Sequence, residues 1–285
     1  MPDIFDMLNS MDTQMPQKRT DFVRSPMSYP GGKSKNFIHI IEHLPYYPRY
    51  VEPFGGGASV LLARKPVEFE VYNDIDSGVV SFYRCLKDQE LLEQLKDWLT
   101  TTVHAREEFI WCRDTWEQED NIVIRAAKWY YTTQYSFGSV GRNFGRATNT
   151  TCILSGKIQR LLPKFQDVHN RLEKVTIEHI DWETRIKDFD SPDTVFYLDP
   201  PYLATRGVSY SNNFNKLDHE HLLETIFETN GFVAISGYPS ELYDKYPWDN
   251  RFEWESFISM QSQAEDNNLF DRGKVPEVLW IKEVK

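Results

Sequence analysis

The chain of 285 residues is 40% hydrophobic and 14% aromatic, which is enough to bury the core of one large or two modest domains. Residues 1–20 contain no apolar secretory leader, and no stretch is as long as a membrane span, so secretion and membrane insertion are not expected. The three cysteines are widely spaced, which favours the reducing cytoplasm and disfavours a disulfide framework or a zinc site. The net charge of −11 disfavours indiscriminate nucleic-acid binding, because phosphate contacts usually supply most of that affinity.

The N-terminal part combines a polar arm with a glycine-containing motif. Residues 1–24 lack hydrophobic periodicity and are predicted to form a flexible arm. The sequence S-Y-P-G-G-K-S-K follows at residues 28–35, and apolar residues at helical spacing then continue to Pro45. The glycines would let the backbone approach a ligand, with Lys33 at the start of the helix. An ordinary loop is the alternative, because the earlier glycine of a full phosphate loop is missing.

Residues 50–63 predict the first strand and helix of a nucleotide-binding sheet. The sequence Y-V-E-P-F-G-G-G-A at residues 50–58 predicts a strand that ends in a glycine turn, and residues 59–63 predict the following helix. Small residues in such a turn leave room for an adenosyl group beside the backbone. Because the triple glycine departs from G-x-G-x-x-G and offers no obvious pyrophosphate site, it favours S-adenosylmethionine over a dinucleotide.

A second strand is predicted at residues 69–73 and is followed by two acids, Asp74 and Asp76. Asp74 lies about 20 residues past the glycine turn, where such sheets place an acid that accepts the ribose hydroxyls. The alternative for Asp74 is a capping role at the start of a predicted helix over 78–86, for which Asp76 or Ser77 is better suited.

The middle of the chain predicts a helical insertion. Residues 91–171 show helical periodicity without strand alternation, with helices near 91–99, 109–116, 122–135 and 157–172. A glycine-rich loop with basic and aromatic side chains occupies residues 136–146, and such an insertion is typical of a substrate-recognition module. The aromatic residues of the helices, such as Trp129, Tyr130 and Tyr131, suit a core better than base stacking, whereas Phe137 and Phe144 lie on the loop.

Two segments are basic although the whole chain is acidic. Residues 142–174 hold seven lysines and arginines against two acids, and residues 17–35 hold five against one. These are the two segments expected to face DNA.

The rest of the chain completes an α/β sheet. Strands are predicted at residues 175–179, 195–198, 232–236, 252–258 and 277–281, with a helix over 218–229, so that a seven-stranded sheet results. Asp181 follows the first of these strands and could accept the amino group of a cofactor adenine, with a plain turn as the alternative. The polar residues 203–215 are expected to close over the substrate.

The sequence D-P-P-Y at residues 199–202 follows a short buried strand, at the sheet edge where α/β proteins bind ligands. Two consecutive prolines stiffen this turn. The Asp199 carboxylate and the Pro200 carbonyl could accept both N–H groups of an exocyclic amine, while Tyr202 stacks on its ring. This arrangement suits attack of the amine nitrogen on a sulfonium methyl group and needs no metal. A turn with a helix-capping aspartate is the alternative.

Four motifs, in this order, resemble the Dam-type (D12 class) DNA adenine-N6 methyltransferases: P-G-G-K at residues 30–33, V-E-P-F-G-G-G-A at 51–58, N-D-I-D at 73–76 and D-P-P-Y at 199–202. The resemblance covers almost the whole chain. It implies a Rossmann-like, S-adenosylmethionine-dependent catalytic domain at residues 25–88 and 173–285, with helices on both faces of its sheet and a helical target-recognition domain inserted at 89–172.

The resemblance also implies three groups of site residues and no metal. The catalytic residues are Asp199, Pro200, Pro201 and Tyr202. The cofactor contacts are Tyr29, Pro30, Gly31, Gly32, Lys33, Pro53, Phe54, Gly55, Gly57, Asp74, Asp181, Trp182 and Asp199, with Asp181 and Trp182 the looser match. The DNA contacts are Phe137, Val140, Arg142, Asn143 and Arg146.

The recognition loop departs from the family pattern. Residues 125–142 resemble the segment R-A…Y-x-N-R-Y-G-Y-N-G-x-C-R that reads GATC, with Arg142 at the specificity arginine. Phe137, Gly138 and Gly141 replace a tyrosine, an asparagine and a cysteine, and the F-N-x-P-[FY]-G stretch that follows in the family is missing. The resemblance therefore implies the activity more strongly than the target sequence, and GATC is not assigned.

The predicted function is site-specific transfer of a methyl group from S-adenosylmethionine to N6 of an adenine flipped out of duplex DNA, with S-adenosylhomocysteine as product. Duplex DNA is the expected partner, and a restriction endonuclease is a candidate functional partner. Methylation of RNA or of cytosine N4 is disfavoured, because those enzymes more often carry Asn or Ser at the position of Asp199. A catalytically silent DNA-binding regulator is disfavoured by the charge, and an NAD-dependent oxidoreductase by the glycine pattern.

Overall fold

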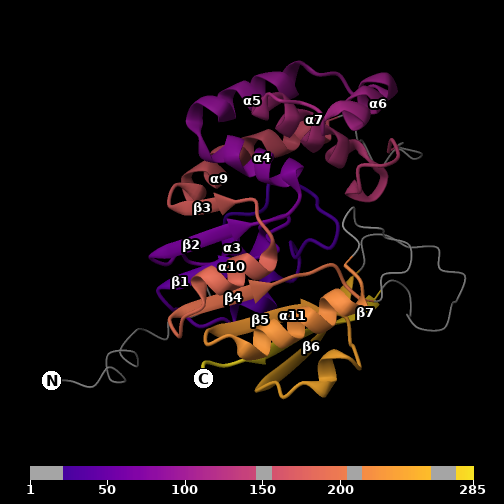
Figure 1. The fold of residues 1–285 in the computed structure, drawn as a ribbon. Helices are drawn as coiled ribbons and strands as arrows, with labels where there is room; N and C mark the ends of the chain where they lie inside the picture. Colours follow the sequence, from indigo (N-terminus) through magenta and orange to yellow (C-terminus); the bar gives the residue numbers. More distant parts are fainter. Residues whose placement is uncertain (1–21, 146–155, 204–213, 258–273) are drawn as a thin grey trace, which may run out of the picture.

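The computed structural model describes residues 22–145, 156–203, 214–257 and 274–285, which form a seven-stranded sheet in the order β3-β2-β1-β4-β5-β7-β6 (Figure 1). Strands β1 to β5 pair in parallel, whereas β7 pairs antiparallel with both β5 and β6. The strands are β1 Arg49–Glu52, β2 Phe69–Asn73, β3 Val175–Glu178, β4 Thr194–Leu198, β5 Phe232–Gly237, β6 Asn250–Phe257 and β7 Lys274–Lys282. The predicted seven-stranded α/β sheet is confirmed.

The sheet is covered on both faces, which explains why its central strands are almost completely buried. Every residue of β4 is buried. Because side chains alternate along a strand, Val195 and Tyr197 join one hydrophobic cluster while Phe196 and Leu198 join the other. The two clusters form the layers on either side of the sheet.

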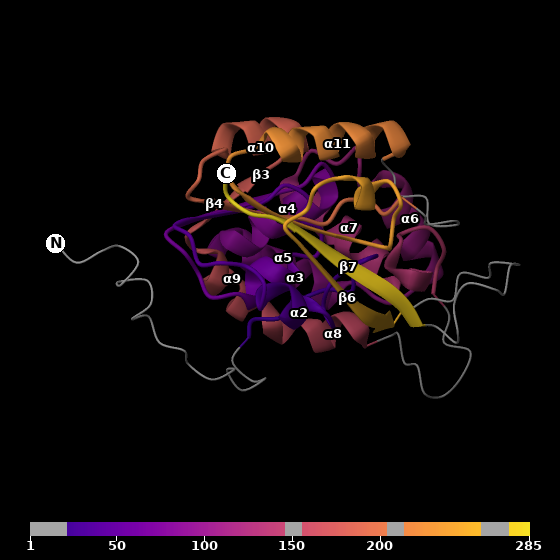
Figure 2. The same cartoon turned by 90° about the horizontal axis from the view of Figure 1, so that it is seen from below.

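Helices make up both outer layers and the insertion. Helices α10 and α11 lie on one face of the sheet, and α2 and α3 lie on the other (Figure 2). The helices are α2 Phe37–Ile41, α3 Ser59–Ala63, α4 Ser77–Lys87, α5 Gln89–Thr101, α6 Arg106–Thr115, α7 Ile122–Tyr135, α8 Lys157–Leu161, α9 Phe165–Leu172, α10 Trp182–Phe189 and α11 Lys216–Glu228, with short 3-10 turns η1 Phe137–Ser139, η2 Leu162–Lys164 and η3 Tyr243–Lys245.

The helical insertion shares its core with the sheet. Helix α4 packs along α7, and Gly78 makes this contact so close that a Cβ there would lie 2.0 Å from the Trp129 ring. One hydrophobic cluster includes Tyr72 of the sheet, Leu95 of α5 and Phe109 of α6. The aromatic residues of α7 belong to this core, as predicted. Whether residues 89–172 act as a recognition domain stays a prediction.

The parallel strands reverse their order between β1 and β4. Strand β1 pairs with β2 on one side and with β4 on the other, with Val51 opposite both Val71 and Phe196. Ligands of open α/β sheets bind at the carboxyl ends of the strands beside such a switch point. The glycine turn after β1, the acids after β2 and the D-P-P-Y sequence after β4 therefore meet at one edge of the sheet.

Two helix predictions were wrong in detail. The helix after the P-G-G-K motif begins at Phe37, so Lys33 lies in the preceding turn, and it ends at Ile41. The single helix expected over 157–172 is divided by η2, because Pro163 has no N–H to continue the helical hydrogen bonds. No helix in the described part of the chain is long and apolar enough to cross a membrane. The predictions for the arm up to residue 21, for Arg146 and for residues 204–213 lie outside the described residues.

Candidate active site

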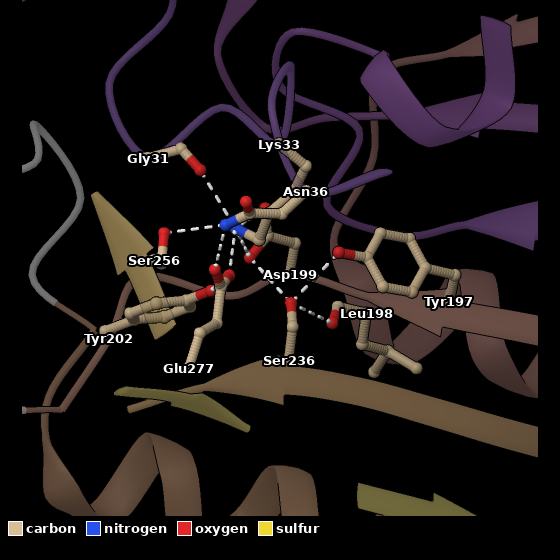
Figure 3. Close-up of polar contacts among 10 residues, drawn as sticks. All are labelled: Gly31, Lys33, Asn36, Tyr197, Leu198, Asp199, Tyr202, Ser236, Ser256 and Glu277. Carbon is tan, nitrogen blue, oxygen red and sulfur yellow. Dashed lines mark hydrogen bonds and ion pairs between the residues drawn. The ribbon is translucent and has the colours of Figure 1, made fainter. Parts of the chain in front are cut away.

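Asp199 and Lys33 form the centre of the site (Figure 3). The Lys33 ammonium lies 2.6 Å from each oxygen of the Asp199 carboxylate, and it also donates to the Gly31 carbonyl at 2.9 Å. The Ser236 hydroxyl at the end of β5 donates to Asp199 Oδ1 at 2.9 Å. Residues 166 positions apart are thus joined by an ion pair that is largely removed from water, since Lys33 is only 5% exposed.

The environment of Asp199 raises the pKa of its carboxyl group above the ordinary value. Burial is the main cause and the nearby Glu277 carboxylate adds to it, whereas the Lys33 ammonium and the Ser236 hydroxyl act in the opposite direction. A partly buried carboxylate whose pKa is raised can accept hydrogen bonds from an amine and is a better proton acceptor than an ordinary aspartate.

The rest of the D-P-P-Y sequence continues the site. Pro200 is buried and Pro201 and Tyr202 are partly buried directly past β4. The Tyr202 hydroxyl donates to Glu277 Oε1 at 2.9 Å, and the Lys33 ammonium lies 4.9 Å from the centre of the Tyr202 ring. The ring of Tyr238 meets the Tyr202 ring edge to face at 4.7 Å. The aromatic side chain is therefore fixed next to the Asp199 carboxylate.

Glu277 is a site residue that the sequence did not reveal. It lies on β7 and is 4% exposed, and its Oε1 lies 3.5 Å from the Lys33 ammonium. Its Oε2 accepts from the Asn36 side-chain amide at 2.6 Å. No motif contains this glutamate; the only signal was a charged residue beside the apolar run of residues 278–281.

The glycine turn after β1 is tied to the end of β2. Gly55 donates to the Asn73 carbonyl, and Gly56 donates to Asp74 Oδ2, both at 2.8 Å. Burial raises the pKa of Asp74 to about 7. Asp76, and not Asp74, caps helix α4, because its side chain accepts from the Gly78 N–H. Asp74 is only 9% exposed, and its Oδ1 accepts from the Asp76 N–H at 2.8 Å, so both of its oxygens already have backbone donors. Its role toward a cofactor stays a prediction.

The glycines also make room for two tyrosine rings. A Cβ at Gly55 would lie 2.2 Å from the Tyr72 ring, and one at Gly56 would lie 2.9 Å from the Tyr29 ring. Gly56 has a φ of +44°, which favours glycine as well. The packing of these two rings by itself requires glycine at positions 55 and 56, and the cofactor contacts predicted for Gly55 and Gly57 stay predictions.

An aromatic cluster lies beside the same turn. The rings of Phe54 and Trp182 are stacked with centroids 6.1 Å apart, and Phe214 meets both rings edge to face. Asp181 accepts from the Thr184 N–H and hydroxyl and caps helix α10. The predicted pair Asp181 and Trp182 thus lies near Phe54, although Asp181 already has a structural task and its role toward a cofactor stays a prediction.

The recognition loop folds back on itself. Phe137 donates to the Asn143 carbonyl at 2.8 Å and Gly145 donates to the Tyr135 carbonyl at 2.7 Å. Phe137 is 67% exposed, whereas Phe144 packs against the rings of His104 and Phe109, so only the first suits base stacking.

The remaining predicted DNA contacts lie on the same loop. Val140 is partly buried, while Arg142 and Asn143 are exposed. The DNA-facing role of these residues stays a prediction.

The donor set of the site suits S-adenosylmethionine. When Asp199, Glu277 and Lys33 are all ionised, these buried side chains carry a net charge of −1, which complements a sulfonium cation. Asp74 lies directly after β2, where the sequence predicts an acceptor for ribose hydroxyls, and this role stays a prediction. Among the described residues, no group of three or more His, Cys, Asp or Glu side chains is arranged to hold a metal ion.

Comparisons with known proteins show which proteins the chain resembles. A family model described as D12 class N6 adenine-specific DNA methyltransferase matches residues 29–256. A DNA adenine methylase from Vibrio cholerae serotype O1 is 27% identical over 217 residues, which cover 72% of this chain and 76% of that protein. Modification methylase LlaI from Lactococcus lactis is 26% identical over 204 residues, covering 66% of this chain and 31% of LlaI. An rRNA methylase structure from Streptococcus thermophilus aligns with 88% of this chain and 98% of its own at 12% identity and a TM-score of 0.32.

The matched region spans well over half of the chain and contains the P-G-G-K, glycine-turn, N-D-I-D and D-P-P-Y motifs. The expected family is thereby confirmed. The chain belongs to the D12 class N6 adenine-specific DNA methyltransferase family, which makes it a transferase that methylates adenine in DNA.

Proposed function

We propose that the chain uses Asp199, Pro200 and Tyr202 to hold an adenine that has been flipped out of duplex DNA while S-adenosylmethionine methylates its N6 atom. The observation that carries this proposal is the Asp199 carboxylate, which is fixed by Lys33 and Ser236 at the end of β4, next to the glycine turn after β1. Flipping is required because N6 is paired inside the duplex, and it costs a few kcal/mol.

The cofactor would lie where β1, β2 and β4 end. Asp74 would accept the ribose hydroxyls, the rings of Phe54 and Trp182 would line the adenosyl group, and Lys33 would face the carboxylate of the methionine part. When bound, S-adenosylmethionine supplies an activated methyl group, so that the N6–carbon bond forms while the carbon–sulfur bond breaks and leaves S-adenosylhomocysteine.

The side chains act on the amine. An Asp199 oxygen accepts one N6 hydrogen and the Pro200 carbonyl accepts the other, which keeps the nitrogen lone pair out of the ring and directs it at the methyl group. Tyr202 stacks on the base and fixes its plane. The methylated nitrogen must lose one proton, and the Asp199 carboxylate, whose pKa burial raises, is the acceptor on the chain.

Substitution of Asp199 tests this proposal. Asp199→Asn keeps the size of the side chain but replaces one acceptor oxygen with a donor, so we expect transfer of labelled methyl to DNA to fall by about 100-fold or more. Asp193→Asn, at an exposed position just before β4, is the matched control and should keep full activity. Melting temperatures would show that both variants fold. Full activity of Asp199→Asn would refute the assignment.

A restriction endonuclease is the proposed functional partner of the chain. Two relatives carry the name modification methylase, which supports pairing with a restriction endonuclease. The proposed location of the chain is the cytoplasm, because its substrate is DNA and its three widely spaced cysteines suit a reducing compartment. Sequencing of methylated adenines in DNA from cells that express the chain would give the recognition site.

A further inference from the structure

Glu277 connects three polar side chains of the active site from a strand that carries no motif. Its Oε1 accepts from the Tyr202 hydroxyl at 2.9 Å and lies 3.5 Å from the Lys33 ammonium, and its Oε2 accepts from the Asn36 amide at 2.6 Å (Figure 3). The Asn36 amide also lies 2.6 Å from the Ser256 hydroxyl of β6. The carboxylate is therefore held by groups from the turn before α2 and from the D-P-P-Y sequence, and Ser256 of β6 in turn holds the Asn36 amide.

The contacts of Asp199 show why a second carboxylate near Lys33 is needed. Both Asp199 oxygens lie 2.6 Å from the Lys33 ammonium, and Oδ1 accepts from Ser236 as well. A target amine can donate a hydrogen bond to Asp199 only if the Lys33 ammonium moves away from at least one of the two carboxylate oxygens. A buried ammonium that moves away from one carboxylate is strongly destabilised unless another anion is near. Glu277 Oε1 lies 3.5 Å from the ammonium and belongs to the chain itself, so it is in place whether or not the cofactor carboxylate proposed to face Lys33 is bound, and a small movement of Lys33 suffices.

The other titratable groups around Asp199 do not compete for this task at neutral pH. Burial raises the pKa of Glu52 to about 8, which keeps that carboxyl group mostly protonated. The pKa values of the surrounding tyrosines, Tyr197, Tyr202 and Tyr238, are raised by burial, so these groups are neutral. Among the residues that the structure describes, Lys33 and Glu277 are the charged groups that shift the pKa of Asp199.

We propose that Glu277 is a positioning residue of the methyl transfer: its carboxylate takes over Lys33 when the target amine binds Asp199, and it holds the Tyr202 ring against the base. This proposal rests on the proposed function, since it assumes that Asp199 receives the amine. Glu277 itself need not touch the substrate, because it acts through Lys33 and Tyr202.

Glu277→Gln separates charge from shape. The amide oxygen can accept from the Asn36 amide while the amide N–H donates to the Tyr202 hydroxyl, so both contacts are kept, but no negative charge remains for Lys33, which stays on Asp199. We expect the kcat of DNA methylation to fall about 10- to 100-fold with an unchanged melting temperature. Glu253→Gln is the matched control, because Glu253 lies on the neighbouring β6 and pairs at the surface with Arg251. This control should keep the kcat of the unmodified chain.

The charge on Glu277 also predicts a shift that a purely structural role would not produce. The Glu277 carboxylate raises the pKa of Asp199, so its removal should move the Asp199 titration to lower pH. Carbon NMR of the ligand-free chain with labelled aspartate carboxyl groups measures this titration, and Asp199→Asn identifies the signal. Glu277→Asp keeps the charge and should keep the titration near that of the unmodified chain.

The outcomes distinguish this proposal from the proposed function. A shifted Asp199 titration together with a reduced kcat in Glu277→Gln supports the role of Glu277. An unchanged kcat or an unchanged titration in that variant would overturn it, even if the unmodified chain methylates adenine. An unmodified chain that methylates no DNA would instead refute the proposed function, and the NMR titration would still report whether Glu277 acts on Asp199.

Discussion

Glu52 illustrates how a single buried acid adjusts to its surroundings. It ends β1 and accepts from the Tyr50 hydroxyl at 2.6 Å, while the Arg64 guanidinium lies 3.8 Å from the centre of the Tyr50 ring. Burial outweighs both neighbours and raises the pKa of Glu52 from 4.5 to about 8. The folded chain therefore binds a proton at Glu52 that the unfolded chain releases well below neutral pH.

This difference predicts a pH dependence of stability. Because the pKa is higher in the folded state, the stability from protonated Glu52 is fully present below pH 4.5 and is lost as the pH rises toward 8. Glu52→Gln cannot titrate, so its free energy of unfolding should gain a few kcal/mol relative to the unmodified chain between pH 5 and pH 8. Chemical denaturation at several pH values measures this.

The matched control for this prediction is Glu68→Gln, at an exposed position before β2. The stability difference between this variant and the unmodified chain should not change with pH. Parallel pH curves for Glu52→Gln and the unmodified chain would contradict the assigned protonation of Glu52.

Individual residues differ in how well the sequence predicted them. Asp76 was the better candidate for the cap of α4, and it is the cap, because the spacing of acids before a helix has few solutions. Glu277 was missed because its partners, Lys33 and Tyr202, are distant in sequence and come together only through sheet pairing. A contact of that kind leaves no periodic or local signal.

Among the elements, the recognition loop carries the clearest prediction. It begins directly after α7, and its backbone is fixed by hydrogen bonds within the loop and by a contact from the Arg113 side chain to the Arg142 carbonyl. Arg142→Ala would leave those backbone bonds in place. We expect this variant to lose about 1–3 kcal/mol of discrimination between target and non-target sequences, as is typical for a lost bidentate base contact.

Methylation rates on target and mismatched duplexes measure that discrimination, and calorimetry of S-adenosylmethionine binding should show no change. Arg84→Ala is a suitable control, because Arg84 is exposed and lies far from the recognition loop. Its neighbour Cys85 contacts the carbonyl of Ile122, which begins α7, whereas the loop follows the other end of that helix. Equal discrimination by Arg142→Ala and the unmodified chain would exclude this arginine as a base contact.

The elements themselves were largely predictable because each had a strong local pattern. The helices over Ser59–Ala63 and Ile122–Tyr135 were predicted at their observed bounds, since turn residues flank them. The failure at residues 157–172 came from giving periodicity more weight than Pro163. The tyrosine rings beside the glycine turn could not be foreseen, because they pack there only after the sheet and the preceding turn have come together.

At the scale of the whole molecule, the helical insertion is tied to the catalytic edge of the sheet. The Tyr130 hydroxyl of α7 donates to the Pro26 carbonyl at 2.7 Å, and the Gln134 side chain makes two hydrogen bonds with the Ser28 backbone at 3.0 and 3.1 Å. The loop that is expected to read DNA directly follows this helix. Its position is therefore coupled by rigid contacts to the turn that carries Lys33.

The chemical identity of the methylated nucleoside tests the proposed role of Asp199 most directly. Duplex DNA incubated with the chain and labelled S-adenosylmethionine can be digested to nucleosides and separated by chromatography with mass spectrometry. We predict that the label appears in N6-methyldeoxyadenosine. Label in N4-methyldeoxycytidine, or no label in DNA while an RNA substrate becomes methylated, would contradict the central claim that Asp199 and its neighbours hold an adenine amine.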